Sequence, residues 1–440
     1  MSSLLIHNGL IVTLNEQDDI IENGSLYIED TVIVDAGSFP PDKYTPDSTI
    51  DAGGRLVMPG LINAHHHLYS TFARGFSPPG EPAGTFTEIL ERLWWKLDRA
   101  LDEEDVYYSA LIAIMHAARA GCTTIIDHHA SPACVDGSLD LIEKAFRDVG
   151  LSGCLCYEIS DRNREAEGLE ENIRFIRKCK AEEDDQITAL MGMHALLTLG
   201  TKTLQKTADA AHDLDTGFHI HVAESEDDAR VTFDKYQRRV MDRLLDFGIP
   251  GNRTIVAHGI HFEAREMDLL KSTDSILVNQ PESNMNNGLG VAPLLECLAR
   301  GVLVGIGTDG MSSHMISQAR AMYLLQRTYR RDPRVMFGEA CDILLKNNRA
   351  ICGRMFKEPR GRLAPGHLAD VVIADYVPFT PLDTDNFYGH LLYGLSFARI
   401  ETTIARGRVI VENGHMVHLD ETEVRAKCVE KARALWGRIH

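Results

Sequence analysis

Hydrophobic positions at the two ends of the chain follow a β pattern. Short Ile/Val-rich runs, separated by turn residues such as Asn8-Gly9 and Asn23-Gly24, are typical of strands. The runs cover residues 4–14, 25–35, 369–375 and 400–417. We expect both ends to pair in one small domain, a β-sandwich made of residues 1–56 and 362–440. Its last stretch, residues 420–440, has the charged amphipathic pattern of a helix.

The middle of the chain, residues 57–361, alternates short apolar runs with long helical patterns. Such alternation is typical of βα units around a parallel sheet. Eight runs have the composition of buried strands: 57–64, 123–127, 153–158, 188–194, 218–223, 254–257, 275–278 and 302–308. Eight strands in about 300 residues predict a (β/α)8 barrel, so the fold class is α/β.

Polar side chains follow the carboxyl end of every predicted barrel strand. In chain order they are His65/His67, His128/His129, Glu158, His194, His221/Glu224, His258, Gln280/Asn284 and Asp309. The active sites of such barrels are built at this face. A chance arrangement would scatter these groups over both strand ends, so the ordering predicts an enzyme site.

The triplet His65-His66-His67 provides the first two candidate metal ligands. Because side chains alternate along a strand, His65 and His67 point to one side and His66 to the other. A hydrolytic metal site needs three or four protein ligands and an open position for water. His221 on the fifth strand and Asp309 after the eighth are the best candidates to complete the set, and His219 is a better candidate for a supporting position.

Two further residues are candidates for the chemical steps. Glu224 follows the ligand candidate His221 by three positions and is placed to move protons from water to a leaving group. His258 ends the sixth strand and could orient the water or stabilise an oxyanion. A protein that only binds a metabolite has no need of a proton shuttle, so we disfavour a non-enzymatic function.

The overall composition excludes several classes of partner. The net charge, 45 − 64 = −19, argues against binding to nucleic-acid phosphates. No apolar run approaches the roughly 20 residues of a membrane span, and the first residues lack the pattern of a signal peptide. The nine scattered cysteines contain no CxxC pair and suit a reducing compartment. We therefore expect a cytoplasmic enzyme.

Ordered motifs along nearly the whole chain resemble the amidohydrolase superfamily, and more narrowly its mononuclear deaminase and chlorohydrolase branch. They are Pro59 to His67, His221-Val222-Ala223-Glu224, Val256-Ala257-His258-Gly259, Ser283-Asn284-Met285, Gly307-Thr308-Asp309 and residues 361–371. The segments 127–132, 157–162 and 386–392 are similar to the aminohydrolase group called SsnA, which is linked to purine catabolism.

The resemblance implies His65, His67, His221 and Asp309 as ligands of one divalent metal ion, usually zinc and sometimes iron. It implies Glu224 as proton shuttle, His258 as partner of the water or oxyanion, and Asp309 as a further proton acceptor. It also implies a homodimer or larger homo-oligomer.

Two departures from the pattern of relatives bear on the reaction. No lysine lies near the end of the fourth strand, so a lysine-bridged pair of metals is disfavoured. Many deaminase relatives have His-Cys-Pro-x-Ser-Asn after the seventh strand, where this chain has Asn279-Gln280-Pro281-Glu282-Ser283-Asn284. An amide thus replaces an imidazole where the substrate is expected.

The candidate substrate contacts are Arg74, His128, Glu158, His194, Gln280 and Asn284. His128 is preferred over His129, since only one of two adjacent side chains faces inward. Trp94 and Trp95 could stack on a ring, although packing between helices is the favoured interpretation of this pair. The polar groups suit a heterocycle with several N–H and C=O groups.

The predicted function is metal-dependent hydrolysis of a non-peptide C–N bond in a small, purine-like heterocycle. Deamination, in which ammonia leaves, is the leading prediction. Hydrolytic ring opening is the alternative, and halide displacement is the third option.

Overall fold

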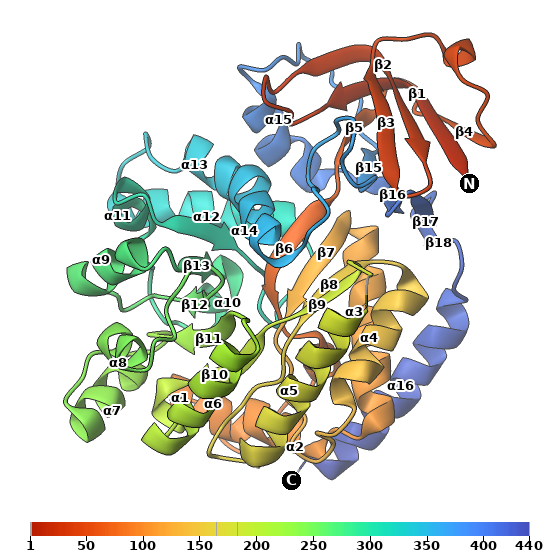
Figure 1. The fold of residues 1–440 in the computed structure, drawn as a ribbon. Coiled ribbons are helices and arrows are strands. Elements are labelled where there is room, and N and C mark those ends of the chain that lie inside the picture. Colours follow the sequence, from red (N-terminus) through yellow and green to blue (C-terminus); the bar gives the residue numbers. More distant parts are fainter. Residues whose placement is uncertain (1, 164, 183, 440) are drawn as a thin grey trace.

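The computed structural model describes residues 2–163, 165–182 and 184–439. It consists of an α/β barrel and a β-sheet domain assembled from both ends of the chain (Figure 1). The predicted fold class is therefore confirmed. The exact division of the chain at residues 56/57 and 361/362 stays a prediction.

The terminal domain contains one nine-stranded sheet. Its order is β18-β17-β16-β15-β5-β1-β2-β3. The ninth strand, β4, pairs in parallel with the first part of β1, and β5 pairs with the last part. The strands are β1 (Ser3–Val12), β2 (Ile20–Glu29), β3 (Val32–Gly37), β4 (Ser48–Asp51), β5 (Leu56–Pro59), β15 (Val371–Ala374), β16 (Ile400–Ala405), β17 (Arg408–Glu412) and β18 (His415–Met416). β5 lies between β1 and β15 and so joins the two ends of the chain.

The barrel strands pair in parallel in two arcs, β6-β7-β8-β9 and β10-β11-β12-β13-β14. Their bounds are β6 (Leu61–His66), β7 (Cys122–Asp127), β8 (Ser152–Leu155), β9 (Ile187–Ala189), β10 (Met191–Ala195), β11 (Phe218–Val222), β12 (Ile255–His258), β13 (Ile276–Asn279) and β14 (Leu303–Ile306). Bridges between His66 and Asp309 and between Ile159 and Met193 connect the two arcs.

Two predicted barrel strands are divided in the structure. The run 57–64 forms β5 and β6, and only β6 belongs to the barrel, so the prediction of one strand is wrong. The break falls at Gly60, where a Cβ would lie 2.3 Å from the Thr123 side chain. The run 188–194 is interrupted at Leu190, so that β9 pairs with β8 while β10 pairs with β11.

Helices follow the barrel strands. They are η2 (Leu68–Ala73), α1 (Phe86–Ile89), η3 (Leu90–Trp94), α2 (Trp95–Ala100), α3 (Glu103–Arg119), α4 (Ser138–Val149), α5 (Glu165–Ala181), η4 (Leu196–Thr198), α6 (Thr201–Asp213), α7 (Glu226–Tyr236), α8 (Val240–Asp246), α9 (Ala264–Ser272), α10 (Pro281–Asn286), α11 (Leu294–Ala299), α12 (Met315–Arg330), α13 (Phe337–Asp342), η5 (Ile343–Asn347) and α14 (Asn348–Met355). The segment between β6 and β7 contributes several short helices beyond the usual one, and these reach the mouth of the barrel.

The other helical elements come from the two end segments of the chain: η1 (Pro41–Lys43), α15 (Phe387–Tyr393), η6 (Leu395–Phe397) and α16 (Glu421–Arg438). The helix predicted at the chain end is α16, and it packs along α3 on the outside of the barrel (Figure 1). Trp436 anchors it by donating its indole N–H to the carbonyl of Phe72 at 2.7 Å. Among the described residues, no helix combines the length and apolar character that crossing a bilayer requires.

Candidate active site

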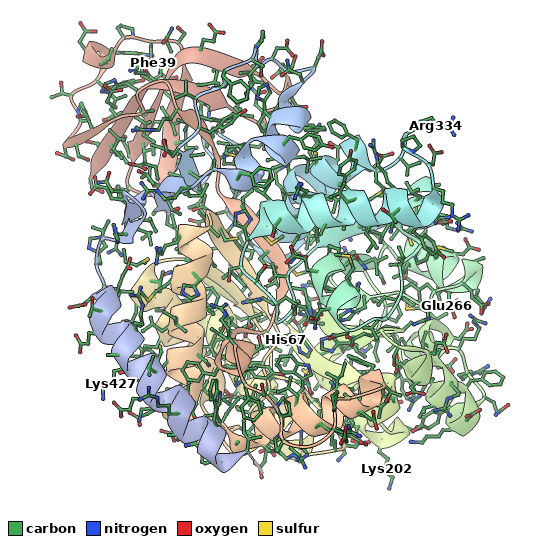
Figure 2. All side chains as sticks on the ribbon, turned by 180° about the vertical axis from the view of Figure 1, so that it is seen from behind. Phe39, His67, Lys202, Glu266, Arg334 and Lys427 are labelled. Atoms are coloured by element: carbon green, nitrogen blue, oxygen red, sulfur yellow. The ribbon has the colours of Figure 1, made fainter. Side chains whose placement is uncertain are left out.

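The candidate ligands meet inside the barrel because the end of β14 approaches the end of β6 very closely. Gly307 allows this approach, since a Cβ there would lie 2.5 Å from the carbonyl oxygen of His65. The amides of Thr308 and Asp309 both donate to that carbonyl. Figure 2 shows His67 within the barrel, while Phe39 lies in the terminal domain at the other end of the molecule. Asp309 is thereby held beside His65 and His67.

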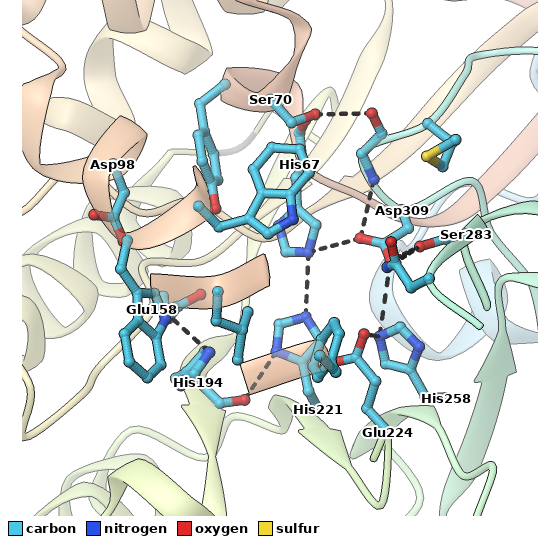
Figure 3. A pocket seen from close by; sticks show the side chains of 18 residues that line it. His67, Ser70, Asp98, Glu158, His194, His221, Glu224, His258, Ser283 and Asp309 are labelled. Carbon is cyan, nitrogen blue, oxygen red and sulfur yellow. Dashed lines mark hydrogen bonds and ion pairs between the residues drawn. The ribbon is translucent and has the colours of Figure 1, made fainter. Parts of the chain in front are cut away.

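Three of the four candidate ligands, His67, His221 and Asp309, turn their donor atoms toward one another at one spot in Figure 3. The Nε2 atoms of His67 and His221 are 3.2 Å apart. Asp309 Oδ1 lies 3.1 Å from His67 Nε2 and 3.8 Å from His65 Nε2. His65, His67 and Asp309 form one of several groups whose ligand atoms are close enough to hold a metal ion.

Hydrogen bonds at the far ring nitrogens fix how the imidazoles face this spot. His67 Nδ1 donates to the carbonyl of His128 at 2.6 Å, and His221 Nδ1 donates to that of His194 at 2.9 Å. His65 Nδ1 lies 2.8 Å from His219 Nε2, which confirms His219 in a supporting position. Each ring therefore turns Nε2 inward, and among the described residues His65 Nε2 has no hydrogen-bond partner. Such outer contacts orient ligand imidazoles in metal sites.

His66 points away from this spot, as the strand period predicts. Its Nδ1 donates to the carbonyl of Asp309 at 2.5 Å. His66 thus helps to hold β6 against the end of β14.

The electrostatics of the cluster favour a positive charge among these atoms. Burial lowers the pKa of His65 well below its usual value, with a further contribution from the charge of His67. Although burial opposes it, the contact with Asp309 raises the pKa of His67 to about 9. The pKa of Asp309 is held well below its usual range, against burial, by its hydrogen bond with His67. His67 Nε2 thus faces both the carboxylate of Asp309 and Nε2 of His221.

Glu224 and His258 lie on the opposite side of Asp309. His258 Nε2 is 3.5 Å from Glu224 Oε1 and 3.9 Å from Asp309 Oδ2. His258 Nδ1 donates to Asn284 Oδ1 at 3.0 Å, which leaves its Nε2 facing Glu224. Burial, together with the charge of Asp309, raises the pKa of Glu224 well above its usual value. Glu224 thus holds a proton readily beside the ligand cluster.

The backbone at these positions adopts an uncommon conformation. Ala223, His258 and Asp309 have φ values of 52°, 74° and 54°. Left-handed backbone at a non-glycine residue costs about 1–3 kcal/mol, and it is concentrated at functional sites. The carboxylate of Asp228 stabilises one such turn by accepting from the amide of Ala223 at 2.8 Å. These turns aim Glu224, His258 and Asp309 into the barrel mouth.

A cavity opens over the cluster, with about 630 Å³ of empty space when the open solvent at its mouth is included. Its lining combines polar strand-end residues with aromatic and apolar side chains from the segment between β6 and β7. The lining residues are His67, Tyr69, Ser70, Phe86, Leu90, Trp94, Trp95, Asp98, Glu158, His194, His221, Glu224, His258, Ser283, Asn287, Asp309, Gly310 and Met311.

One wall of this cavity, Glu158 with His194, is backed by a charged pair. Arg162 donates to Asp98 at 2.9 Å, lies 3.6 Å from Glu158 Oε1, and places its guanidinium over the ring of Trp95. Burial raises the pKa of Glu158 to about 7, although Arg162 opposes the rise. We call Glu158 and His194 the polar wall.

The six predicted substrate contacts have different outcomes. Glu158 and His194 line the cavity. Arg74 is exposed, does not line it, and lies 3.5 Å from His116, so the structure does not bring Arg74 to the site. It comes directly after η2, of which Tyr69 and Ser70 line the cavity.

The other three predicted contacts lie behind the lining. Gln280 is buried and donates to the carbonyl of Val278, and Asn284 holds His258. His128 packs against the rings of His67 and His221, while His129 turns away to Ser131. These residues support the site without facing the cavity.

Several lining residues were not predicted as substrate contacts. The preference for helix packing at Trp94 and Trp95 is wrong, because both line the cavity. Tyr69, Asp98 and Ser283 also line it, and Ser283 donates to Asp309 Oδ2 at 2.6 Å. The adjacent pair Trp94-Trp95 is the sequence feature that indicates an aromatic lining. No feature of the sequence indicates that Asp98 lies there.

Comparison with known proteins matches residues 56–410 to the model of the amidohydrolase family. The chain belongs to this family. A 5-methylthioadenosine/S-adenosylhomocysteine deaminase of Pelotomaculum thermopropionicum is 27% identical over the whole of both chains. A 5'-deoxyadenosine deaminase of Methanosarcina acetivorans is 28% identical, covering 98% of this chain and 97% of its own.

Solved structures share the fold. An adenosine deaminase from Xanthomonas campestris with bound zinc superposes with a TM-score of 0.86 at 21% identity, covering 100% of this chain and 98% of its own. Atrazine chlorohydrolase from Arthrobacter aurescens complexed with zinc has a TM-score of 0.81 at 21% identity, covering 98% of this chain and 100% of its own. At this identity the likeness supports the barrel and terminal-sheet architecture.

Proposed function

We propose that this protein is a metal-dependent aminohydrolase that deaminates a purine-like heterocycle. The observation that carries the proposal is a set of overlapping donor groups beside a cavity, which bring His65, His67, His221 and Asp309 together and place Glu224 next to Asp309. The named relatives, which are deaminases of adenosine-type compounds, support the same class of reaction.

The donor set suits one divalent metal ion held by His65, His67, His221 and Asp309. The observed donor separations of 3.1, 3.2 and 3.8 Å are short enough for these side chains to share one ion. A cation at this spot would also supply the missing partner of His65 Nε2.

Zinc is the metal that we propose, because nitrogen ligands with one carboxylate are typical of catalytic zinc sites. Two relatives of known structure were solved with zinc. A homodimer or larger homo-oligomer and a cytoplasmic location stay predictions.

A divalent metal ion supplies a water nucleophile near neutral pH by lowering the pKa of water. The residues of the chain do the remaining work. Asp309 accepts a proton as water attacks the ring carbon that bears the amino group. Glu224 carries a proton to the departing nitrogen, which leaves as ammonia. His258, fixed by Asn284, donates through Nε2 toward the developing oxyanion when it carries a proton there.

The aromatic side of the cavity positions the substrate. Trp94, Trp95 and Phe86 line the cavity, and flat rings stack well on such side chains. We expect the heterocycle to lie against them with its amino-bearing carbon directed at Glu224.

The test is to incubate metal-loaded protein with a panel of amino-substituted purines and related rings and to determine product mass and ammonia. Exchange of NH for O with one ammonia released per product is the expected result. Inertness of the whole panel, with the metal site demonstrably filled, would count against the proposal.

A further inference from the structure

The polar wall presents two hydrogen-bond acceptors to the cavity. His194 Nδ1 lies 2.7 Å from Thr198 Oγ1, and the Thr198 hydroxyl donates to the carbonyl of Ala195 at 3.0 Å. With its hydrogen on that carbonyl, Thr198 Oγ1 accepts from His194 Nδ1, and we assign the ring hydrogen to Nδ1 on this basis. His194 Nε2 is left with a lone pair, and it faces Glu158 at 3.9 Å.

Glu158 offers an acceptor beside His194 whether or not it is ionised. His128 Nε2 donates to the carbonyl of Met193 at 3.0 Å, so His128 Nδ1 carries a lone pair. That lone pair lies 3.7 Å from Glu158 Oε2 and has no other partner among the described residues. Oε2 is therefore the oxygen that faces this lone pair and is the better place for a proton on Glu158, which leaves Oε1, facing His194, as an acceptor.

We propose that this pair of acceptors selects heterocycles that carry neighbouring N–H groups on one edge, as in lactam and cyclic-urea rings such as oxopurines. The inference rests on the proposed function and specifies its substrate class. The ring nitrogens of adenine are acceptors. Facing Glu158 Oε1 and His194 Nε2, they would bring lone pairs against lone pairs. The adenosine-type substrates named for the relatives therefore fit this wall poorly.

The polar wall contacts the reacting ring of the substrate and not a sugar attached to that ring. Ligand atoms of Glu158 and His194 lie within 4.8 Å of one another and of His221, a proposed metal ligand. A group bound between them therefore lies within one ring width of the reacting carbon. The hydroxyls of a ribose could also donate to two acceptors, but the ribose of a purine nucleoside projects from the ring away from the amino group.

Arg162 is a positioning residue for this wall. It does not line the cavity, yet it is held by Asp98 at 2.9 Å and stacks on Trp95. From there its guanidinium lies 3.6 Å from Glu158 Oε1 and fixes the side of the carboxylate that faces the cavity.

The test measures binding of xanthine, its 1-, 3-, 7- and 9-methyl derivatives and adenosine to zinc-loaded protein by calorimetry. A methyl group on the recognised edge removes a donor from a site built for it, so we expect at least one methyl position to weaken binding about 10²-fold or more. Methyl positions away from that edge should matter little. A flat response to all four methyl groups, or tighter binding of adenosine than of xanthine, overturns the inference.

Variants of Glu158 separate recognition from folding. Gln keeps an oxygen on the cavity side and can donate its amide to His128, so Glu158→Gln should keep the methyl preference to within about tenfold. Glu158→Leu has similar bulk and no acceptor, and the preference should disappear. Thr198→Val frees the ring hydrogen of His194 and should reduce the preference. Retention of the full preference in Glu158→Leu contradicts the assigned role.

The binding assay also distinguishes this inference from the proposed function. Methyl-selective binding of xanthine with no product from any amino-oxopurine would leave the wall assignment standing and reject deamination. Deamination of adenosine, with equal binding of all the methylxanthines, would support deamination and reject the role assigned to the polar wall.

Discussion

The two sides of the cavity are built from different kinds of structure. The metal side consists of side chains at the ends of β6, β11 and β14, each held by a second hydrogen bond through its other ring nitrogen or carboxylate oxygen. The substrate side combines Glu158 and His194 with residues from the short helices between β6 and β7.

This difference in structure suggests that the metal side carries out the reaction and that the substrate side determines which molecule is bound. Strands in a closed barrel hold ligands rigidly, since neighbours on both sides fix their register. Side chains on the inserted helices can be substituted without disturbing the register of the barrel strands. We therefore expect changes on the metal side to abolish the reaction and changes on the substrate side to alter which molecule reacts.

The largest expected effect comes from removing a ligand. His221→Ala should lose the metal and reduce kcat/KM by about 10⁴-fold or more, because the nucleophile is no longer generated. Metal content by atomic emission and steady-state kinetics measure the two effects. His212→Ala, an exposed histidine on α6, is the matched control and should keep both values. Full zinc content in His221→Ala would remove His221 from the ligand set.

Glu224→Gln should reduce kcat by about 10²–10⁴-fold while the metal stays bound, since only the proton transfer is lost. The comparison variant is Glu226→Gln on the exposed face of α7, which should behave as the parent protein. Metal content and kcat, measured on the same samples, show whether proton transfer is lost while the metal stays bound. An active Glu224→Gln protein would mean that another group moves the proton.

A supporting residue should give an intermediate effect. Ser283→Ala removes the hydrogen bond to Asp309 Oδ2, and loss of such an outer contact typically weakens metal binding about 10–100-fold. Competition with a chelator of known affinity measures this change. Ser396→Ala, which loses only a bond to the carbonyl of Leu392 in the terminal domain, should bind metal normally. Equal affinities in the two variants would show that Ser283 does not orient Asp309.

The substrate side should respond differently. Trp95→Ala should leave metal content unchanged and raise KM roughly tenfold, because an aromatic contact contributes about 0.5–1.5 kcal/mol beyond its buried area. Phe379→Ala, at an exposed position, is the control. Loss of metal from Trp95→Ala would mean that the two sides of the cavity are not independent.

The smallest effect concerns stability. Burial raises the pKa of Asp127 to about 7 from 3.8 in the unfolded chain. Between these pH values the folded protein keeps a proton that the unfolded chain has released, so this group makes stability fall as pH rises through that window. Asp127→Asn mimics the protonated acid, and its free energy of unfolding should fall less between pH 5 and pH 8. Urea titrations with the same pH slope in both proteins would contradict this assignment.

Periodicity and strand order predicted the barrel and the metal side of the site. His65 and His67 alternate with His66, and each candidate ligand follows a recognisable apolar run, so local pattern was sufficient. The break at Gly60 was missed because it depends on Thr123, more than sixty positions away. Ala223, His258 and Asp309 have left-handed backbone that no local pattern indicated.

The substrate side could not be predicted to the same extent. Asp98 and Trp95 reach the cavity only because short helices cross the barrel mouth, and Arg162 acts through both of them. Arg74, by contrast, follows β6 closely in sequence yet points outward. Nearness in sequence to a candidate ligand predicts a place in the site for residues at a strand end, but not for residues in an inserted segment.

The central claim is most directly tested by the mass of the product formed in ¹⁸O-labelled water by zinc-loaded protein from an amino-oxopurine. The account predicts exchange of NH for a single labelled oxygen, with one ammonia released per product. A product that has gained a whole water molecule, with no ammonia released, would mean that the ring is opened and would contradict deamination.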